Sequence, residues 1–266
     1  MAEPILEVRD LTFSYEGFST PVFRDISFSV SPGDIFVILG ANGAGKSTLL
    51  NCMTGILTQY RGEILLHGRP LRQIPIRERA LMMGYVPQVA VPTFNYTVRD
   101  YVVMGRAPHI GLLGTPSEEE YARADAAIRE MGIEKLSSKL VTRISGGERQ
   151  QVQIARVLTQ GANLIILDEP TNHLDFGNQL KILDIIKSLS EQGLAIILTT
   201  HMPDHAILLD RRIGILDHTG HMTAGALRDV LTESALKQLY DTDLRLLHID
   251  ELGRDICVAV GWRKAP

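Results

Sequence analysis

The sequence predicts an α/β fold built on a largely parallel sheet, and three observations support this. Apolar runs over residues 35–39, 164–167 and 195–200 have the composition of buried strands, and segments with helical periodicity separate them. A glycine-rich loop at residues 40–47 joins the first of these strands to a helix. Strands that alternate with helices are typical of a parallel sheet covered by helices. At 266 residues the chain is long enough for one large domain or for a core with a subdomain.

The first element is an antiparallel sheet that precedes the glycine-rich loop. Residues 5–8, 11–15 and 26–30 alternate apolar and polar side chains, and the turn signal at 31–34 closes the series. Tyr15 ends one of these stretches. Its ring could stack on a base or simply be exposed, and this pattern alone leaves both interpretations open.

The glycine-rich loop has the spacing G-x-x-x-x-G-K-[ST]. With the threonine that follows, its residues are Gly40, Ala41, Asn42, Gly43, Ala44, Gly45, Lys46, Ser47 and Thr48. Glycines at this spacing let backbone N–H groups curl around an anion, while Lys46 supplies a positive charge and Ser47 a hydroxyl for magnesium. A glycine-rich turn that serves packing alone is the alternative, but the strand–loop–helix context is the one that phosphate binding requires. The loop therefore predicts a bound nucleoside triphosphate with Mg²⁺.

The segment after the loop helix continues the core and ends at a ligand-binding position. Residues 62–69 are interpreted as a hairpin arm, and residues 82–86 as a core strand. The strand stops at Pro87, which leaves Gln88 at its carboxyl end, where α/β sheets bind ligands.

Residues 89–159 have a helical pattern and are interpreted as a helical subdomain inserted into the core. Thr97 opens a short helix, and Ser117 opens a longer one that stops at Gly132. Between these helices, residues 105–114 are expected to form a loop whose apolar side chains suit a partner surface.

The core resumes at residue 160 and ends in a hairpin. Its expected elements are strands at 164–167, 195–200 and 213–217, helices near 179–191 and through 226–240, and a terminal hairpin within 244–262.

Two carboxylates end the strand at 164–167. Adjacent side chains at a strand end diverge, so Asp168 is assigned to the metal side and Glu169 to the attacking water as general base. The alternative is that both acids only begin a loop. His201 ends the next apolar strand, from which an imidazole can reach a terminal phosphate or a water.

A second anion site is predicted at residues 144–151. Ser145 and Glu148 form a capping box, which gives these two residues a complete structural explanation. Gly146 and Gly147 lower helix stability, yet they expose N–H groups at the positive end of the helix dipole, which suits a phosphate.

Composition excludes some classes of function. Hydrophobic content of 45% and charged content of 22% are ordinary for a soluble globular protein, and the net charge of −4 disfavours a nucleic-acid partner. No secretion signal is expected, because acidic residues occupy the first ten positions. The apolar runs are shorter than the roughly 20 residues that span a bilayer. Any membrane role must therefore come through a partner. Cys52 and Cys257 are interpreted as reduced thiols of a cytoplasmic protein.

Taken together, these residues resemble the ATP-binding subunit of an ABC transporter over nearly the whole chain. The matching motifs are Walker A (Gly40 to Ser47), the Q-loop (Gln88), the signature (Ile144 to Glu148), Walker B (Leu164 to Glu169), the D-loop (Asn172 to Asp175) and the H-loop (His201). Six motifs in the right order are far more specific than any one of them. Tyr15 falls at the adenine-stacking aromatic of the family.

The resemblance implies one ABC ATPase domain over 1–266. Residues 1–88 and 160–266 would form the RecA-like core with its antiparallel β subdomain, and 89–159 the helical subdomain with the signature. ATP and Mg²⁺ are the implied cofactors, with Ser47, Gln88 and Asp168 on the magnesium side. Glu169 and His201 are the implied catalytic residues.

The resemblance also implies an assembly. Two subunits would form a head-to-tail homodimer in which Ser145, Gly146, Gly147 and Glu148 of one subunit complete the ATP site of the other, and Asp175 would lie in the D-loop. Closure on ATP and release after hydrolysis would drive an integral-membrane permease. The subunit would sit peripherally on the cytoplasmic face of the membrane, coupled indirectly to an external substrate-binding protein.

Within the family, residues 101–109, 174–179 and 230–240 are similar to importers of iron-siderophore, haem or cobalamin chelates. Some close relatives instead handle molybdate or tungstate. A soluble ABC ATPase acting on DNA or ribosomes is disfavoured by the short gap between Walker A and the signature and by the single cassette. A regulatory module without turnover is disfavoured by Glu169. The sequence departs from the motifs of the family only mildly. In the signature, Ile144 and Glu148 replace a commoner leucine and glutamine, and after the H-loop histidine His201 comes Met202, where many relatives carry an acid.

Overall fold

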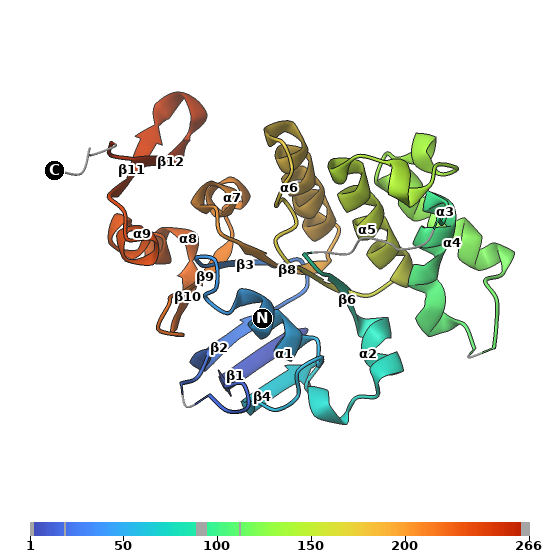
Figure 1. Ribbon diagram of the computed structural model, residues 1–266, viewed down its shortest axis with the longest axis horizontal. Helices are drawn as coiled ribbons and strands as arrows, with labels where there is room; N and C mark the ends of the chain where they lie inside the picture. Colours follow the sequence, from blue (N-terminus) through green and yellow to red (C-terminus); the bar gives the residue numbers. More distant parts are fainter. Residues whose placement is uncertain (1–2, 19, 89–94, 112, 262–266) are drawn as a thin grey trace.

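The computed structural model describes residues 3–18, 20–88, 95–111 and 113–261 (Figure 1). Its strands are β1 Leu6–Phe13, β2 Phe23–Val30, β3 Ile35–Leu39, β4 Arg61–Leu66, β5 Arg69–Pro70, β6 Met83–Val86, β7 Leu164–Leu167, β8 Ala195–Thr200, β9 Arg212–Leu216, β10 Met222–Ala226, β11 Leu244–Ile249 and β12 Arg254–Ala259. Its α-helices are α1 Lys46–Met53, α2 Ile76–Met82, α3 Val98–Val103, α4 Glu118–Glu130, α5 Gly146–Gln160, α6 Phe176–Glu191, α7 Pro203–Leu209, α8 Leu227–Val230 and α9 Glu233–Tyr240. Short 3₁₀ helices cover Leu71–Gln73, Met104–His109, Glu134–Leu136, Val141–Arg143 and Asp250–Leu252.

The central sheet has the order β10-β9-β3-β8-β7-β6 and confirms the predicted parallel core. Strands β9, β3, β8, β7 and β6 are parallel to their neighbours, and β10 pairs antiparallel with β9 at one edge. Side chains alternate between the two faces: Ile35, Val37 and Leu39 of β3 pack in one buried cluster, and Phe36 and Ile38 in the other. Because both faces are covered, the strand is apolar at every position.

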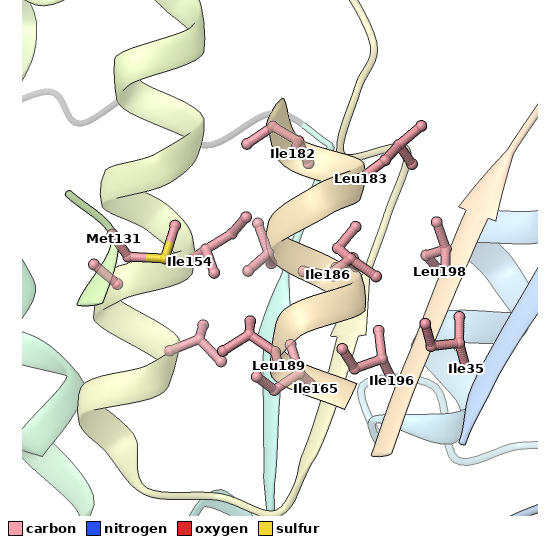
Figure 2. Close-up of a cluster of buried hydrophobic side chains, with 14 of the residues drawn as sticks. Ile35, Met131, Ile154, Ile165, Ile182, Leu183, Ile186, Leu189, Ile196 and Leu198 are labelled. Carbon is pink, nitrogen blue, oxygen red and sulfur yellow. The ribbon is translucent and has the colours of Figure 1, made fainter. Parts of the chain in front are cut away.

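The first face is covered by α5, α6 and α7. In Figure 2, Ile186 and Leu189 of α6 lie between α5 and the sheet, close to Ile165 of β7 and to Ile196 and Leu198 of β8. Helices α5 and α6 therefore share one apolar core with the strands whose ends carry Glu169 and His201.

The second face is covered by α1 and by a four-stranded antiparallel sheet with the order β2-β1-β4-β5. The two alternating stretches expected at 5–8 and 11–15 lie in a single strand, β1, whose register shifts between Val8 and Leu11. Asp10 is in the left-handed region at this shift, with φ of 47°. Gly62 of β4 lies so close to this part of β1 that a Cβ on residue 62 would be 2.4 Å from the Asp10 carbonyl oxygen. Only glycine fits at this position.

The helical segment lies beside the β6 edge of the central sheet (Figure 1). Thr97 caps α3 by accepting a hydrogen bond from Asp100 N, and Ser117 with Glu120 forms the capping box of α4, both as predicted. The loop expected at 105–114 differs: its first half belongs to the 3₁₀ helix over Met104–His109. Gln88 and residues 95–111 and 113–261 are described, whereas 89–94, Leu112 and 262–266 lie outside the described residues.

The C-terminal segment contains two helices where one was expected through 226–240. The break falls at Thr232, whose hydroxyl accepts from Ala235 N and so begins α9. The terminal hairpin is confirmed as β11 and β12, and in Figure 1 it extends from the side of the molecule near α9. Helices α2 and α7 and strand β10 were not predicted. Among the described residues, no helix combines the length and the apolar character that a bilayer crossing requires.

Candidate functional site

The glycine-rich loop follows the central strand β3 and leads directly into α1. Gly43 and Gly45 have φ of 81° and 98°, a conformation that L side chains rarely adopt. A Cβ at Gly45 would also lie 2.6 Å from Val22 Cγ1. No side chain caps the start of α1, so its first N–H groups are left to an external acceptor. This is the backbone arrangement that binds a phosphate.

Lys46 is the buried cation of this loop. Its side chain is 5% exposed, and Nζ donates to the carbonyl oxygens of Gly40 at 2.8 Å and Ala41 at 3.1 Å. The same ammonium forms an ion pair with Glu169 Oε1 at 3.0 Å. Breaking a buried ion pair leaves an uncompensated charge, so any ligand that separates the two groups must supply a replacement charge.

Glu169 lies at the centre of a polar cluster with Lys46, Gln88, Asn172 and His201, called the Glu169 cluster below. Besides Lys46, its Oε2 lies 3.0 Å from Asn172 Nδ2, 3.3 Å from Gln88 Nε2 and 3.2 Å from His201 Nδ1. Gln88 follows β6, Glu169 follows β7 and His201 follows β8, and these are neighbouring parallel strands. The carboxyl ends of these strands, together with the loop that follows β3, therefore bring four residues named from the sequence to one point: Lys46, Gln88, Glu169 and His201.

Asp168 and Glu169 point to different partners, and Thr199 connects them. The Thr199 hydroxyl donates to Asp168 Oδ1 at 2.6 Å and accepts from Glu169 N at 2.8 Å. Glu169 has φ of 45°, which costs about 1–2 kcal/mol for a residue with a side chain and needs such support. Sequence reasoning missed Thr199. Its position next to the acids follows from its place on the neighbouring parallel strand, two residues before His201.

The predicted adenine-stacking residue, Tyr15, lies beside the loop helix. Its hydroxyl is 3.0 Å from Thr48 Oγ1 on α1, and its ring meets Phe13 edge-on. The side chain is exposed, which leaves the ring accessible. Ser47 is half-buried, one position before Thr48 on the same helix.

The predicted second anion site begins α5. The Ser145 hydroxyl accepts from Glu148 N, and Glu148 accepts from Ser145 N, which lowers the pKa of this carboxyl group. Gly147 has a packing reason that the sequence did not reveal, because a Cβ there would lie 2.6 Å from Asn178 Cγ on α6. Gly146 has open space around it apart from a 3.7 Å approach of Leu174 Cδ2.

Asp175 caps the neighbouring helix α6. Its Oδ1 accepts from Asn178 N at 2.8 Å, and this backbone hydrogen bond is the main cause of a lowered pKa of the Asp175 carboxyl group. Because Gly147 of α5 lies against Asn178 of α6, the starts of the two helices are adjacent. Within the described part of the chain, no hydrogen bond or ion pair joins residues 145–148 to residues 40–48. The starts of α1 and α5 are therefore two separate places at which glycines expose backbone N–H groups.

The fold and the phosphate loop place this chain in the class of P-loop nucleoside triphosphatases, in which a strand–loop–helix binds the phosphates and an acidic strand end serves the hydrolysis.

Comparison with known proteins narrows the class. The family model described as ABC transporter matches residues 23–172. An uncharacterized ABC transporter ATP-binding protein of Haemophilus influenzae is 38% identical over 92% of this chain and 92% of its own length. A protein of Helicobacter pylori J99 named "Probable iron chelatin transport ATP-binding protein" is 33% identical over 93% of this chain and 98% of its own length. Other relatives are named iron(3+)-hydroxamate, cobalamin, hemin and molybdate import ATP-binding proteins.

Solved structures indicate the same family as the sequence relatives. A structure described as an inward-facing metal-chelate type ABC transporter aligns with a TM-score of 0.87 and 30% identity, covering 97% of this chain and 98% of that one. The chain belongs to the ABC transporter family as an ATP-binding protein, and it is an ATPase of the kind coupled to transport.

Proposed function

We propose that this chain is the ATP-hydrolysing subunit of an importer of metal chelates. Two observations together carry the proposal. The Glu169 cluster is suited to ATP hydrolysis, and nearly the whole chain is similar to iron chelatin, hydroxamate, hemin and cobalamin import subunits and to a metal-chelate type transporter.

Hydrolysis is assigned to Glu169 and His201. ATP phosphates bind to the loop residues and compete with the Glu169 carboxylate for Lys46. Once released from the ammonium, Glu169 accepts the proton of the attacking water, and His201, 3.2 Å from Oε2, orients the carboxylate and the water. Gln88 and Asn172 hold the same Oε2 and restrict how far the carboxylate can move.

The residues present fit Mg²⁺. It is a hard cation that prefers oxygen ligands, and the Ser47 hydroxyl, the buried Asp168 carboxylate and the Gln88 amide supply them. Asp168 is positioned by the Thr199 hydroxyl on one oxygen, which leaves the other for a cation. When bound, Mg²⁺ would neutralise charge on the phosphates.

The start of α5 is proposed to act on the ATP of a second copy. It lies apart from this chain's own phosphate loop, and among the described residues no lysine or arginine side chain forms a hydrogen bond or an ion pair with residues 145–147. Ser145, Gly146, Gly147 and Glu148 would therefore complete a site whose charge the other subunit supplies. A head-to-tail homodimer gives this arrangement twice.

We further propose that the homodimer binds the cytoplasmic face of an integral-membrane permease, with an external substrate-binding protein coupled to it indirectly and with no nucleic acid involved. The segment from Gln88 to His109 is the proposed contact. Its described part includes the exposed side chains of Tyr96 and Met104. Crosslinks from this segment to a permease helix test the assignment, and crosslinks that map only elsewhere would refute it.

The cargo is tested on the assembled transporter. The chain is purified with its permease and binding protein, and ATPase activity is measured with ferric hydroxamate, hemin, cobalamin or molybdate. Stimulation by a chelate supports the proposal. Stimulation by molybdate alone would assign the chain to the oxyanion importers instead, as the similarity to a molybdate import subunit allows.

A further inference from the structure

Helix α9 ends in a tyrosine that reaches the strand end carrying His201. The Tyr240 hydroxyl donates a hydrogen bond of 2.6 Å to the backbone carbonyl oxygen of His201. The two residues are 39 positions apart, so tertiary packing alone creates this contact. Burial raises the pKa of the Tyr240 phenol, which keeps the hydroxyl protonated as a donor.

The peptide group that follows His201 is held from both sides. Its carbonyl oxygen accepts from Tyr240, and its N–H, which belongs to Met202, donates to Thr200 Oγ1 at 3.1 Å. Because the side chain leaves the same backbone, these two hydrogen bonds restrict where the imidazole can point. The imidazole Nδ1 faces Glu169 Oε2 at 3.2 Å.

Tyr240 itself is firmly placed. Helix α9 starts at the Thr232 cap, and its Leu236 and Leu239 are buried in the main core cluster. The helix ends directly after Tyr240, where Asp241 takes the left-handed conformation with φ of 48°. The hydroxyl is therefore presented by a helix whose position the core determines.

The terminal hairpin braces this arrangement. Glu233 on α9 accepts a hydrogen bond from Leu246 N of β11, and Asp204 on α7 accepts one from Cys257 N of β12. The hairpin thus connects α9 with α7, the helix that begins two residues after His201.

We propose that Tyr240 is a positioning residue for catalysis, which holds the His201 backbone so that the imidazole faces the Glu169 carboxylate. It touches none of the reacting groups and acts through His201. The inference rests on the catalytic role proposed above for His201. It gives the C-terminal segment from Thr232 to Ala259 a part in the ATPase reaction beyond packing.

The test compares two substitutions that each remove one phenolic hydroxyl from the full-length chain. Tyr240→Phe removes the donor to His201. Tyr60→Phe, in the antiparallel part of the molecule where Arg72 stacks on the ring, is the matched control. We expect Tyr240→Phe to lower kcat by about three- to tenfold, the rate equivalent of one hydrogen bond, with KM for ATP unchanged. The control keeps wild-type kcat. Wild-type kcat in Tyr240→Phe, or an equal change in KM, would overturn the proposal.

A second measurement separates the positioning role from the catalytic role of His201. In protein with labelled histidine, the His201 imidazole signal is identified by its loss in His201→Gln, and its chemical shift is followed in Tyr240→Phe and Tyr60→Phe. A shift in Tyr240→Phe alone supports positioning, and an unchanged signal refutes it. Wild-type turnover in His201→Gln would instead refute the proposed catalytic role, whatever the signal in Tyr240→Phe does.

Discussion

The starts of α1 and α5 both present glycines and backbone N–H groups, yet they differ in charge and in capping. At α1, no side chain caps the helix, and buried Lys46 lies 3.0 Å from a carboxylate within the same chain. At α5, Ser145 and Glu148 cap the helix, and among the described residues no lysine or arginine side chain forms an ion pair or a hydrogen bond with residues 145–147. The first start can bind a triphosphate by itself. We propose that the second adds N–H groups and a hydroxyl to a phosphate whose charge Lys46 of a second copy neutralises.

The largest expected effect comes from removing the Glu169 carboxylate charge, which competes with the ATP phosphates for Lys46. Glu169→Gln should lower ATP turnover at least about a hundredfold, the range of a lost general base. ATP should bind more tightly, because the ammonium no longer faces a carboxylate. Steady-state hydrolysis and nucleotide binding measure the two effects, with dimer formation followed by gel filtration. Wild-type turnover would remove Glu169 as the base.

The next effect tests whether the α5 start works in trans. Ser145→Arg should lower turnover about ten- to a hundredfold, because the phosphate loses a donor set in the closed dimer, while each subunit still binds ATP. A mixture of Ser145→Arg with Lys46→Ala subunits should regain turnover, since one intact composite site forms in each mixed dimer. No recovery on mixing, or unchanged turnover in Ser145→Arg, would contradict the assignment.

A matched pair of glycine substitutions separates packing from phosphate binding. Gly147→Ala should destabilise the fold by about 1–3 kcal/mol, because its methyl group meets Asn178, which is itself bonded to Asp175. Gly146→Ala has room and should keep or slightly raise stability, as alanine favours helices, yet lose turnover. Urea unfolding and ATPase assays measure both. Equal stability of the two variants would show that the α5–α6 contact accommodates an added methyl group without loss of stability.

The smallest effect concerns pH. The Ser145 backbone N–H, followed by its hydroxyl, lowers the pKa of Glu148 in the fold. A depressed carboxyl pKa contributes stability that is present above the unfolded value of 4.5 and is lost as the pH falls through the folded value. Because the carboxyl group is accessible, we expect a few tenths of a kcal/mol.

Glu148→Gln should therefore flatten the acid limb of the stability curve, measured by urea unfolding between neutral pH and about pH 3. The exposed Glu251→Gln is the control and should leave the curve unchanged. An acid limb identical in Glu148→Gln and wild type would show that the α5 cap does not depend on the carboxylate.

The sequence by itself determined the parallel core and the places where its chemistry lies. Apolar runs and the loop spacing identify β3, β7 and β8 and put Lys46, Glu169 and His201 at their carboxyl ends, because parallel strands bring those ends to one edge. Capping residues identified the starts of α3, α4 and α5. The division into a RecA-like core and a helical subdomain, and the roles of the site residues, remain predictions.

The tertiary structure decided the contacts that link distant segments. The Thr199 bridge to Asp168, the Gly147–Asn178 contact and the Tyr240 bond to His201 each join side chains on different elements. Local periodicity reports which face of an element is buried, but it does not report which polar group of another element meets that face. The ion pair of Lys46 with Glu169 was also beyond the sequence, because both residues carry complete functional explanations without each other.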